Sequence, residues 1–270
     1  MPRWRWRLGW RDVAEHRARK RFGQHFLHDG NVIDRIVRAI NPKPGEALVE
    51  IGPGLGALTV PLLKRCDVLT VIEIDRDVIP PLREACGHHP GLKVIQADAL
   101  EVDFATLRAD GPLRVVGNLP YNISTPLLFH LLEHAGAIED MHFMLQKEVV
   151  RRMAAEPDTD DYGRLTATIA ARAEVAELFT VGPGAFTPPP QVDSAVVRLV
   201  PRPPPFAIDN LARYDEVVKL AFGQRRKTLS NALRSIASAS RIEAAGIDPR
   251  ARGETLSPAD FARLANSLEP

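Results

Sequence analysis

The chain has 270 residues, which suits one large domain or two modest ones, and 45% of its residues are hydrophobic, enough for a sizeable core. Its 35 Lys and Arg residues nearly balance 34 Asp and Glu residues, so net charge alone favours no particular partner. Two cysteines, Cys66 and Cys86, exclude a disulfide framework and lack the spacing of a zinc site, so we expect a reducing compartment and no metal.

The first 25 residues are unusually basic, with eight Arg and Lys residues against two acidic ones. We interpret residues 1–19 as a basic arm that ends next to Arg19, Lys20 and Arg21, although a solvated tail fits this composition equally well. A mitochondrial transit segment is less favoured because the arm holds no Ser or Thr. The longest apolar run is interrupted by glycines, prolines and Glu50, so no membrane span is predicted.

Farther along, apolar runs alternate with helical patterns, as a parallel sheet with crossover helices requires. Helices are predicted over 56–65, 76–85 and 124–134, the last with Ser124 or Thr125 as its N-cap. The last two predicted strands suggest a closing antiparallel pair at one edge of the sheet. Strands are predicted over 46–51, 67–74, 92–95, 113–117, 141–145, 173–181 and 192–200.

The proline-rich stretch at 201–206 separates this α/β pattern from short helical segments rich in Ala, Leu and Arg. We therefore predict a Rossmann-like α/β domain over 20–203 and a small helical domain over 204–270.

The first chemical signal is "VEIGPGLG", where Gly52, Gly54 and Gly56 follow a strand and open a helix. Glycines there let a ligand approach the backbone closely, although a plain tight turn is the alternative. Glu73 lies 21 residues beyond Gly52, near the end of the next strand, where a carboxylate can accept both hydrogen bonds of a ribose diol. NAD and S-adenosylmethionine both carry that diol, so these residues do not separate the two.

Asp98 follows the third strand, where its carboxylate can accept from the exocyclic amine of an adenine; a helix-capping Asp is the alternative. In "GNLPY", the Asn118 oxygen and the Leu119 carbonyl can point into the crevice together, and Pro120 helps to fix that turn. Two converging acceptors can bind an amino group, and Tyr121 supplies a face on which a base can stack. The alternative is that this stretch is only a turn.

Several motifs in order resemble the ribosomal RNA adenine N6-dimethyltransferases, from about Lys20 to the C-terminal end. Leu119 and the "VDS" triplet are more similar to the small-subunit enzymes than to the macrolide-resistance methylases, which usually read NIPY. His25 stands where the family usually has Asn. The motifs are "KRFGQHFL", "EIGPGLGALT", "VIEID", "ADAL", "GNLPYNISTPLLFHLL" and "FTPPPQVDSAVVRL".

The resemblance implies an S-adenosylmethionine-dependent methyltransferase sheet that dimethylates two adjacent adenosines near the 3′ end of small-subunit rRNA. It implies that the target adenine is sandwiched between Tyr121 and Phe186, although a core aromatic is the alternative for Phe186. The implied catalytic residues are Asn118, Leu119, Pro120, Tyr121 and Phe186, and the implied cofactor-binding residues are His25, Leu27, Gly52, Gly54, Glu73, Asp98, Ala99 and Asn118.

Basic side chains are expected to contact RNA phosphates without reading sequence, although a solvated face is the alternative for the "QRRK" cluster. The expected partner is the rRNA of a small ribosomal subunit precursor, bound by a monomer in the cytoplasm. The competing functions are a large-subunit rRNA methylase, a noncatalytic ribosome-assembly factor and a NAD-dependent oxidoreductase. The candidate RNA-binding residues are Arg19, Lys20, Arg21, Arg225, Arg226, Lys227 and Arg234.

Overall fold

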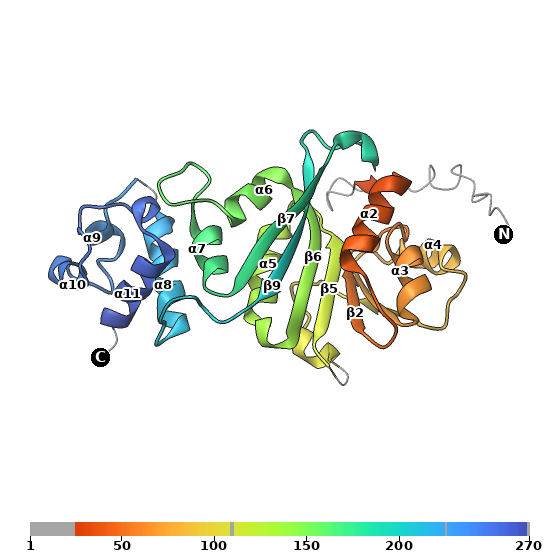
Figure 1. Ribbon diagram of the computed structural model, residues 1–270, viewed down its shortest axis with the longest axis horizontal. Helices are drawn as coiled ribbons and strands as arrows, with labels where there is room; N and C mark the ends of the chain where they lie inside the picture. The colour runs from red at the N-terminus through yellow and green to blue at the C-terminus, as the bar shows by residue number, and fades with distance from the viewer. Residues whose placement is uncertain (1–24, 109–110, 225, 269–270) are drawn as a thin grey trace.

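A seven-stranded sheet forms the centre of the molecule in a computed structural model that describes residues 25–108, 111–224 and 226–268 (Figure 1). The strand order is β4, β3, β2, β5, β6, β9, β7. The first five strands run parallel, and β9 runs antiparallel to both of its neighbours. The strands are β2 (Ala47–Ile51), β3 (Leu69–Glu73), β4 (Leu92–Gln96), β5 (Leu113–Asn118), β6 (Ile138–Gln146), β7 (Ala173–Val181) and β9 (Ser194–Pro201).

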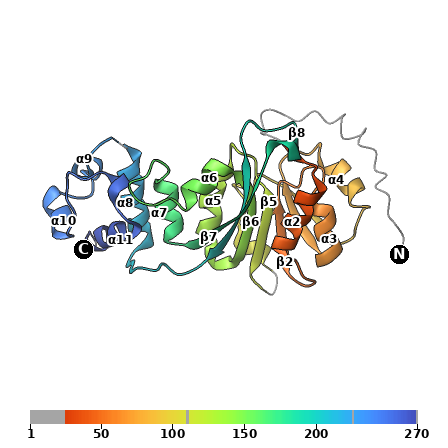
Figure 2. The same cartoon turned by 45° about the horizontal axis from the view of Figure 1, so that its top comes forward.

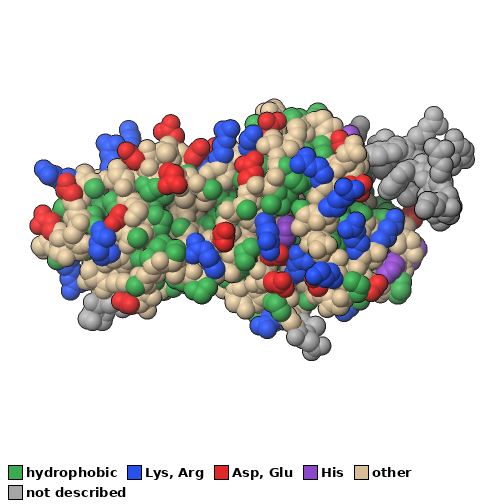
Figure 3. Space-filling model, in the orientation of Figure 1, with side chains coloured by type: hydrophobic (Ala, Val, Ile, Leu, Met, Phe, Trp, Pro, Cys, Tyr) green, Lys and Arg blue, Asp and Glu red, His purple; other side chains and the backbone are tan. Residues whose placement is uncertain are grey.

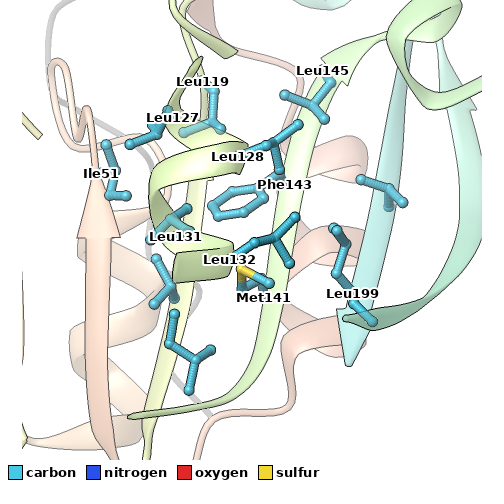
Figure 4. Close-up of a cluster of buried hydrophobic side chains, with 14 of the residues drawn as sticks. Ile51, Leu119, Leu127, Leu128, Leu131, Leu132, Met141, Phe143, Leu145 and Leu199 are labelled. Carbon is cyan, nitrogen blue, oxygen red and sulfur yellow. The ribbon is translucent and has the colours of Figure 1, made fainter. Parts of the chain in front are cut away.

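Both faces of the sheet are buried, because alternate residues of its strands enter two separate hydrophobic clusters. On β5, for example, Val115 packs toward one face and Val116 toward the other. Helices α2 (Gly30–Ile40), α3 (Thr59–Cys66) and α4 (Ile79–Ala85) cover one face, and α5 (Ser124–Glu133), α6 (Lys147–Met153) and α7 (Arg164–Ala170) cover the other. Figure 4 shows leucines of α5 packed against Met141 and Phe143 of β6.

A second, helical unit follows the sheet and lies at the opposite end of the molecule from α3 and α4 (Figure 1). Its hydrophobic cluster includes Ala167 and Ala171, so this unit packs directly on the α7 segment. The hydroxyl of Tyr214 also donates to the carbonyl of Ala167, at 2.8 Å. Its helices are α8 (Leu211–Gly223), α9 (Leu229–Ala232), α10 (Ala239–Ala244) and α11 (Pro258–Ser267).

Two further strands form a separate antiparallel pair, which connects the start of the described chain to the segment between β7 and β9. These strands are β1 (Phe26–Leu27) and β8 (Phe186–Thr187). Figure 2 shows β8 raised above the sheet, on the side where α2 begins. The short 3-10 turns are η2 (Phe104–Leu107), η3 (Ala135–Ala137), η4 (Pro183–Ala185) and η5 (Gly253–Thr255).

All seven predicted strands are present, and the predicted antiparallel pair at one edge is confirmed as β9 and β7. Two predicted helices begin three residues later than expected, at Thr59 and Ile79. The predicted N-cap of α5 was wrong: Ile123 is the cap residue, and Ser124 is the first helical residue, its hydroxyl donating to the carbonyl of Tyr121. The division between residues 203 and 204 stays a prediction, and the arm over 1–19 lies outside the described residues.

A search of the described helices for a long apolar segment finds none able to cross a membrane.

Candidate active site

The order of the strands places a crevice between β2 and β5. The chain runs from β2 outward through β3 and β4, then returns to the other side of β2 with β5. Such a switch point leaves space at the carboxyl ends of the two central strands, where open α/β sheets bind their ligands. A cavity of about 960 Å³ lies there. It is lined by Gly52 after β2, by Glu73 at the end of β3 and by Asn118 at the end of β5.

The cavity brings together almost the whole predicted site. All eight predicted cofactor-binding residues line it, as do four of the five predicted catalytic residues. The sequence separates some of these residues widely, but the carboxyl edge of the sheet and strand β1 bring them to one place. The residues concerned are His25, Leu27, Gly52, Gly54, Glu73, Asp98, Ala99, Asn118, Leu119, Pro120 and Tyr121.

The glycine loop adopts a backbone conformation that other residues rarely take. The φ angles of Gly52, Gly54 and Gly56 are 66°, 54° and 89°. Because of these angles α3 begins only at Thr59, and the backbone of the loop lines the cavity. A side-chain carbon on Gly54 would lie 3.3 Å from the ring of Phe26, so this glycine also lets β1 pack close to the loop.

Two carboxylates lie at the carboxyl ends of the next strands, Glu73 as the last residue of β3 and Asp98 two residues after β4. Glu73 is 6% exposed; its Oε1 accepts from the amide of Asp75 at 2.8 Å, and burial raises the pKa of the carboxyl. Asp98 is half-buried, and its Oδ1 accepts from the amide of Leu100 at 2.9 Å. Asp98 therefore stabilises a local turn, not the start of a helix as the alternative interpretation expected, and it lines the cavity as well.

The orientation of the Asn118 amide follows from one hydrogen bond. Its Nδ2 donates to the main-chain carbonyl of His25 at 3.1 Å, and a carbonyl can only accept. The bond therefore assigns the two ends of the amide, and Oδ1 is the acceptor that Asn118 can offer to the cavity. Leu119 also lines the cavity, and the residue as a whole is 1% exposed; its amide donates to the carbonyl of Met144 at 3.2 Å.

Tyr121 is half-buried at the edge of the cavity and held at two places. Its hydroxyl shares a hydrogen bond with the Ser194 hydroxyl at 2.7 Å. Its ring lies against the imidazole of His25, with centroids 5.4 Å apart and planes inclined by 31°. Burial raises the pKa of the Tyr121 phenol, so the ring is neutral at physiological pH.

Phe186 is the one predicted catalytic residue that does not line the cavity. Its side chain is 2% exposed and packs in the cluster formed by α2, α3 and one face of the sheet. Within the β1–β8 pair it stands opposite Leu27, and the next residue, Thr187, lines the cavity instead. In this conformation its ring lies in the core, as the alternative interpretation expected, and its contact with the target base stays a prediction.

Sequence reasoning missed Glu50, which precedes the glycine loop and lines the same cavity. It is 1% exposed, its Oε2 has no hydrogen-bond partner, and burial raises its pKa to about 8. A carboxylate inside an otherwise apolar strand was the signal that could have identified it. Helix α2 was missed as well, although His28 and Asn31 near its start line the cavity.

The predicted RNA-binding residues lie away from this cavity or outside the described chain. Arg226, Lys227 and Arg234 are exposed on the loops around α9. Arg225 and the arm residues Arg19, Lys20 and Arg21 lie outside the described residues. The assignment of all seven to RNA stays a prediction.

Comparison with known proteins agrees with this geometry. The model of the family described as ribosomal RNA adenine dimethylase matches residues 15–269. The chain belongs to that family. It is 58% identical over 250 residues to "Ribosomal RNA small subunit methyltransferase A" of Xanthomonas campestris, covering 92% of this chain and 95% of the relative. The protein of the same name from Xanthomonas oryzae is 57% identical over 254 residues, covering 94% and 97%.

Two solved structures are similar to most of this chain. A dimethyladenosine transferase from Plasmodium falciparum is similar with a TM-score of 0.71 and 27% identity, over 89% of this chain and 96% of that one. The 23S rRNA methyltransferase ErmE is similar with a TM-score of 0.67 and 32% identity, over 90% and 99%. The predicted family, the methyltransferase fold, the enzyme class and S-adenosylmethionine as the methyl donor are thereby confirmed.

Proposed function

We propose that this protein dimethylates N6 of two adjacent adenosines near the 3′ end of small-subunit rRNA, using S-adenosylmethionine. The observation that carries the proposal is the fixed amide of Asn118 at the end of β5, beside the Tyr121 ring and on the same cavity as Glu73 and Asp98. A dinucleotide-dependent oxidoreductase would need no such acceptor for an amine.

The residues of the cavity fit the proposed methyl donor. Apart from histidines and Tyr121, its ionisable lining is mostly acidic: Asp34, Glu73 and Asp98 stand against Lys64, and Glu50 is a further acid that keeps its proton to about pH 8. Because an opposite charge nearby favours the ionised form of a carboxyl, a cationic ligand would favour ionisation of Glu50, whose Oε2 has no hydrogen-bond partner in the protein. Glu73 would hold the ribose diol and Asp98 the adenine amine, while the glycine loop lets the ligand approach the backbone. When bound, S-adenosylmethionine supplies a methyl group already activated on a sulfonium.

The protein's own contribution is orientation and electrostatics rather than acid–base chemistry. The lone pair of an adenine amine is delocalised into the ring, so the nitrogen is a poor nucleophile until it becomes pyramidal. Asn118 Oδ1 and the Leu119 carbonyl would accept from that amine and stabilise the pyramidal form. Tyr121 would stack on the base once the base has been taken out of its helix. The second methylation requires the site to admit a nitrogen that already carries one methyl.

The choice of the small subunit rests on similarity over nearly the full chain. The Xanthomonas campestris protein named for the small subunit is 58% identical, whereas ErmE, named for 23S rRNA, is 32% identical. Leu119 in "NLPY" supports the same choice. We further propose that the enzyme acts as a monomer, in the cytoplasm, on an assembly precursor of the subunit.

The test is transfer of labelled methyl from S-adenosylmethionine to small subunits that lack the modification, followed by nucleoside analysis of the rRNA. We expect two N6,N6-dimethyladenosines per subunit and no label on matched large subunits. Label only on large subunits would replace the proposal with the large-subunit methylase. Absence of label on both would favour a noncatalytic assembly factor.

A further inference from the structure

Ser194 anchors the hydroxyl of Tyr121 to the start of β9, between two other strands of the sheet. It is the first residue of β9, is fully buried, and pairs with Gln146 of β6 on one side and Val181 of β7 on the other. Its Oγ lies 2.7 Å from the Tyr121 Oη. A side chain on a strand with neighbours on both sides has little freedom to move, so this bond fixes the far end of the phenol.

His25 supports the same ring from its face. Its Nδ1 lies 2.8 Å from the carbonyl of Pro188, and because a carbonyl only accepts, Nδ1 carries the proton. The imidazole is thereby fixed against the Tyr121 ring, 5.4 Å away between centroids. The main chain of His25 also accepts the Asn118 amide, so one residue contacts both side chains that would meet the target adenine.

These contacts leave Tyr121 with one ring face for a ligand. One face lies against His25, the hydroxyl is tied to Ser194, and the residue still lines the cavity. Ordering a freely rotating side chain costs conformational entropy when the base binds. A ring whose plane is already fixed avoids that cost and holds the base in the orientation that the reaction needs.

We infer that Ser194 and His25 are positioning residues for methyl transfer, which hold Tyr121 and Asn118 in the orientation that receives the target adenine. The inference rests on the proposed function. It assigns His25 to the part of the site that receives the target adenine, because His25 contacts Tyr121 and Asn118 and is itself held by Pro188. Neither residue needs to touch the reacting atoms.

A double-mutant cycle between Ser194 and Tyr121 tests the first half. Ser194→Ala and Tyr121→Phe each remove the same hydrogen bond, so each should slow single-turnover methyl transfer on saturating subunits by about 5- to 10-fold. The double variant should be no slower than either single one, because the bond can be lost only once. The affinity for S-adenosylmethionine, measured by calorimetry, should change less than twofold.

Thr168→Ala is the matched control, because Thr168 is buried on α7 and does not line the cavity. It should transfer methyl at the normal rate, even if it lowers the melting temperature as much as Ser194→Ala does. Such a result separates loss of positioning from loss of stability.

Two variants divide the role of His25. His25→Phe keeps a ring against Tyr121 but loses the donor to Pro188, whereas His25→Asn keeps a donor but loses the ring. Both should slow methyl transfer, and His25→Ala should slow it more than either. Binding of the subunit, followed by filtration, should stay within twofold in all three variants.

Multiplicative effects in the Ser194–Tyr121 cycle, or normal rates in either single variant, would overturn the assignment of Ser194. Normal transfer by His25→Ala would overturn that of His25. If the unmodified protein transfers no methyl at all, the proposed function fails instead, so the two failures are distinguishable.

Discussion

Single residues in this cavity have their hydrogen-bonding roles fixed by their neighbours. Asn118 is the clearest case, since one N–H of its amide donates to the His25 carbonyl, and this bond assigns which end of the amide carries the acceptor oxygen. The role proposed for Asn118 is to align the N6 amine of the target adenine.

Replacing Asn118 with Ala should therefore leave cofactor affinity largely intact and slow methyl transfer by roughly 10²- to 10³-fold, the cost of removing one preorganised polar group from a transition state. Single-turnover rates on saturating, unmethylated subunits measure the loss directly. Asn118→Asp is a useful companion, because its carboxylate cannot donate to His25. A normal rate in Asn118→Ala would mean that another acceptor receives the adenine amine.

Glu50 gives a prediction about pH. Its pKa is raised by burial from 4.5 to about 8, so the folded protein keeps a proton that the unfolded chain has already released. At any pH between these two pKa values, unfolding therefore releases a proton. The free energy of unfolding falls as pH rises from about 4.5 to 8, by an amount on the order of 4 kcal/mol.

Glu50→Gln removes this titration. In chemical denaturation without cofactor, the variant should gain stability relative to the unmodified protein as the pH is raised from 5 to 8. A stability difference that stays constant across this range would show that Glu50 is ionised in the folded protein. Glu139→Gln, a change at an exposed position on β6, is the control and should give a constant difference.

At the scale of elements, the site depends on how closely β5 approaches β2. Gly117, just before Asn118, lies so near the end of β2 that a side-chain carbon would stand 2.4 Å from the carbonyl oxygen of Ile51. That oxygen belongs to the backbone and cannot rotate away. The absence of a side chain at Gly117 therefore sets the separation between the glycine loop and the Asn118 amide.

Gly117→Ala should force the two strands apart, with a loss of about 1 to 3 kcal/mol in the free energy of unfolding and a large loss of methyl transfer. Gly136→Ala is the matched change, because nothing lies within 4 Å of the added carbon. It should be neutral or slightly stabilising. Equal stabilities of the two variants would contradict the close approach.

The same scale explains what the sequence could predict. The strands were found because they are buried on both faces and form short, nearly continuous apolar runs. The start of α3 was misplaced because the preceding turn is set by the backbone angles of glycines, and that of α4 because Asp75 holds a turn by accepting from the amide of Asp77. Helix α2 could have been found, since Ile33, Val37 and Ile40 recur on one face after the capping Asp29.

Contacts between distant segments were beyond local patterns. The His25–Pro188 and Tyr121–Ser194 bonds join residues 163 and 73 positions apart, and no spacing rule pairs them. The burial of Phe186 likewise follows from its pairing with β1. The sequence therefore predicted which residues line the cavity better than it predicted how they are held.

At the scale of the whole molecule, the cofactor cavity and the helical unit lie in different parts of one elongated body (Figure 1). Buried contacts of α7 and of the residues just before and after it join the helical unit to the sheet part. One of these contacts is a hydrogen bond from the Tyr162 hydroxyl to the Leu256 carbonyl at 2.7 Å. On the face seen in Figure 3, Lys and Arg side chains are interspersed with Asp and Glu over the helical unit. RNA binding by the helical unit would therefore depend on a local group of Lys and Arg side chains.

The exposed group Arg226, Lys227 and Arg234 is the candidate. Neutralising all three with Gln should weaken binding to small subunits and make its logarithmic dependence on salt shallower, by about 0.7 to 0.9 for each phosphate that the protein no longer neutralises. Cofactor affinity should not change, because none of the three lines the cavity.

The matched control neutralises Arg76, Arg83 and Lys93, which are exposed near α4 and β4 at the other end of the molecule. Filter binding over a salt series measures both slopes. Equal slopes in the two triple variants would mean that the group is an ordinary solvated face and that the phosphates are bound elsewhere on the protein.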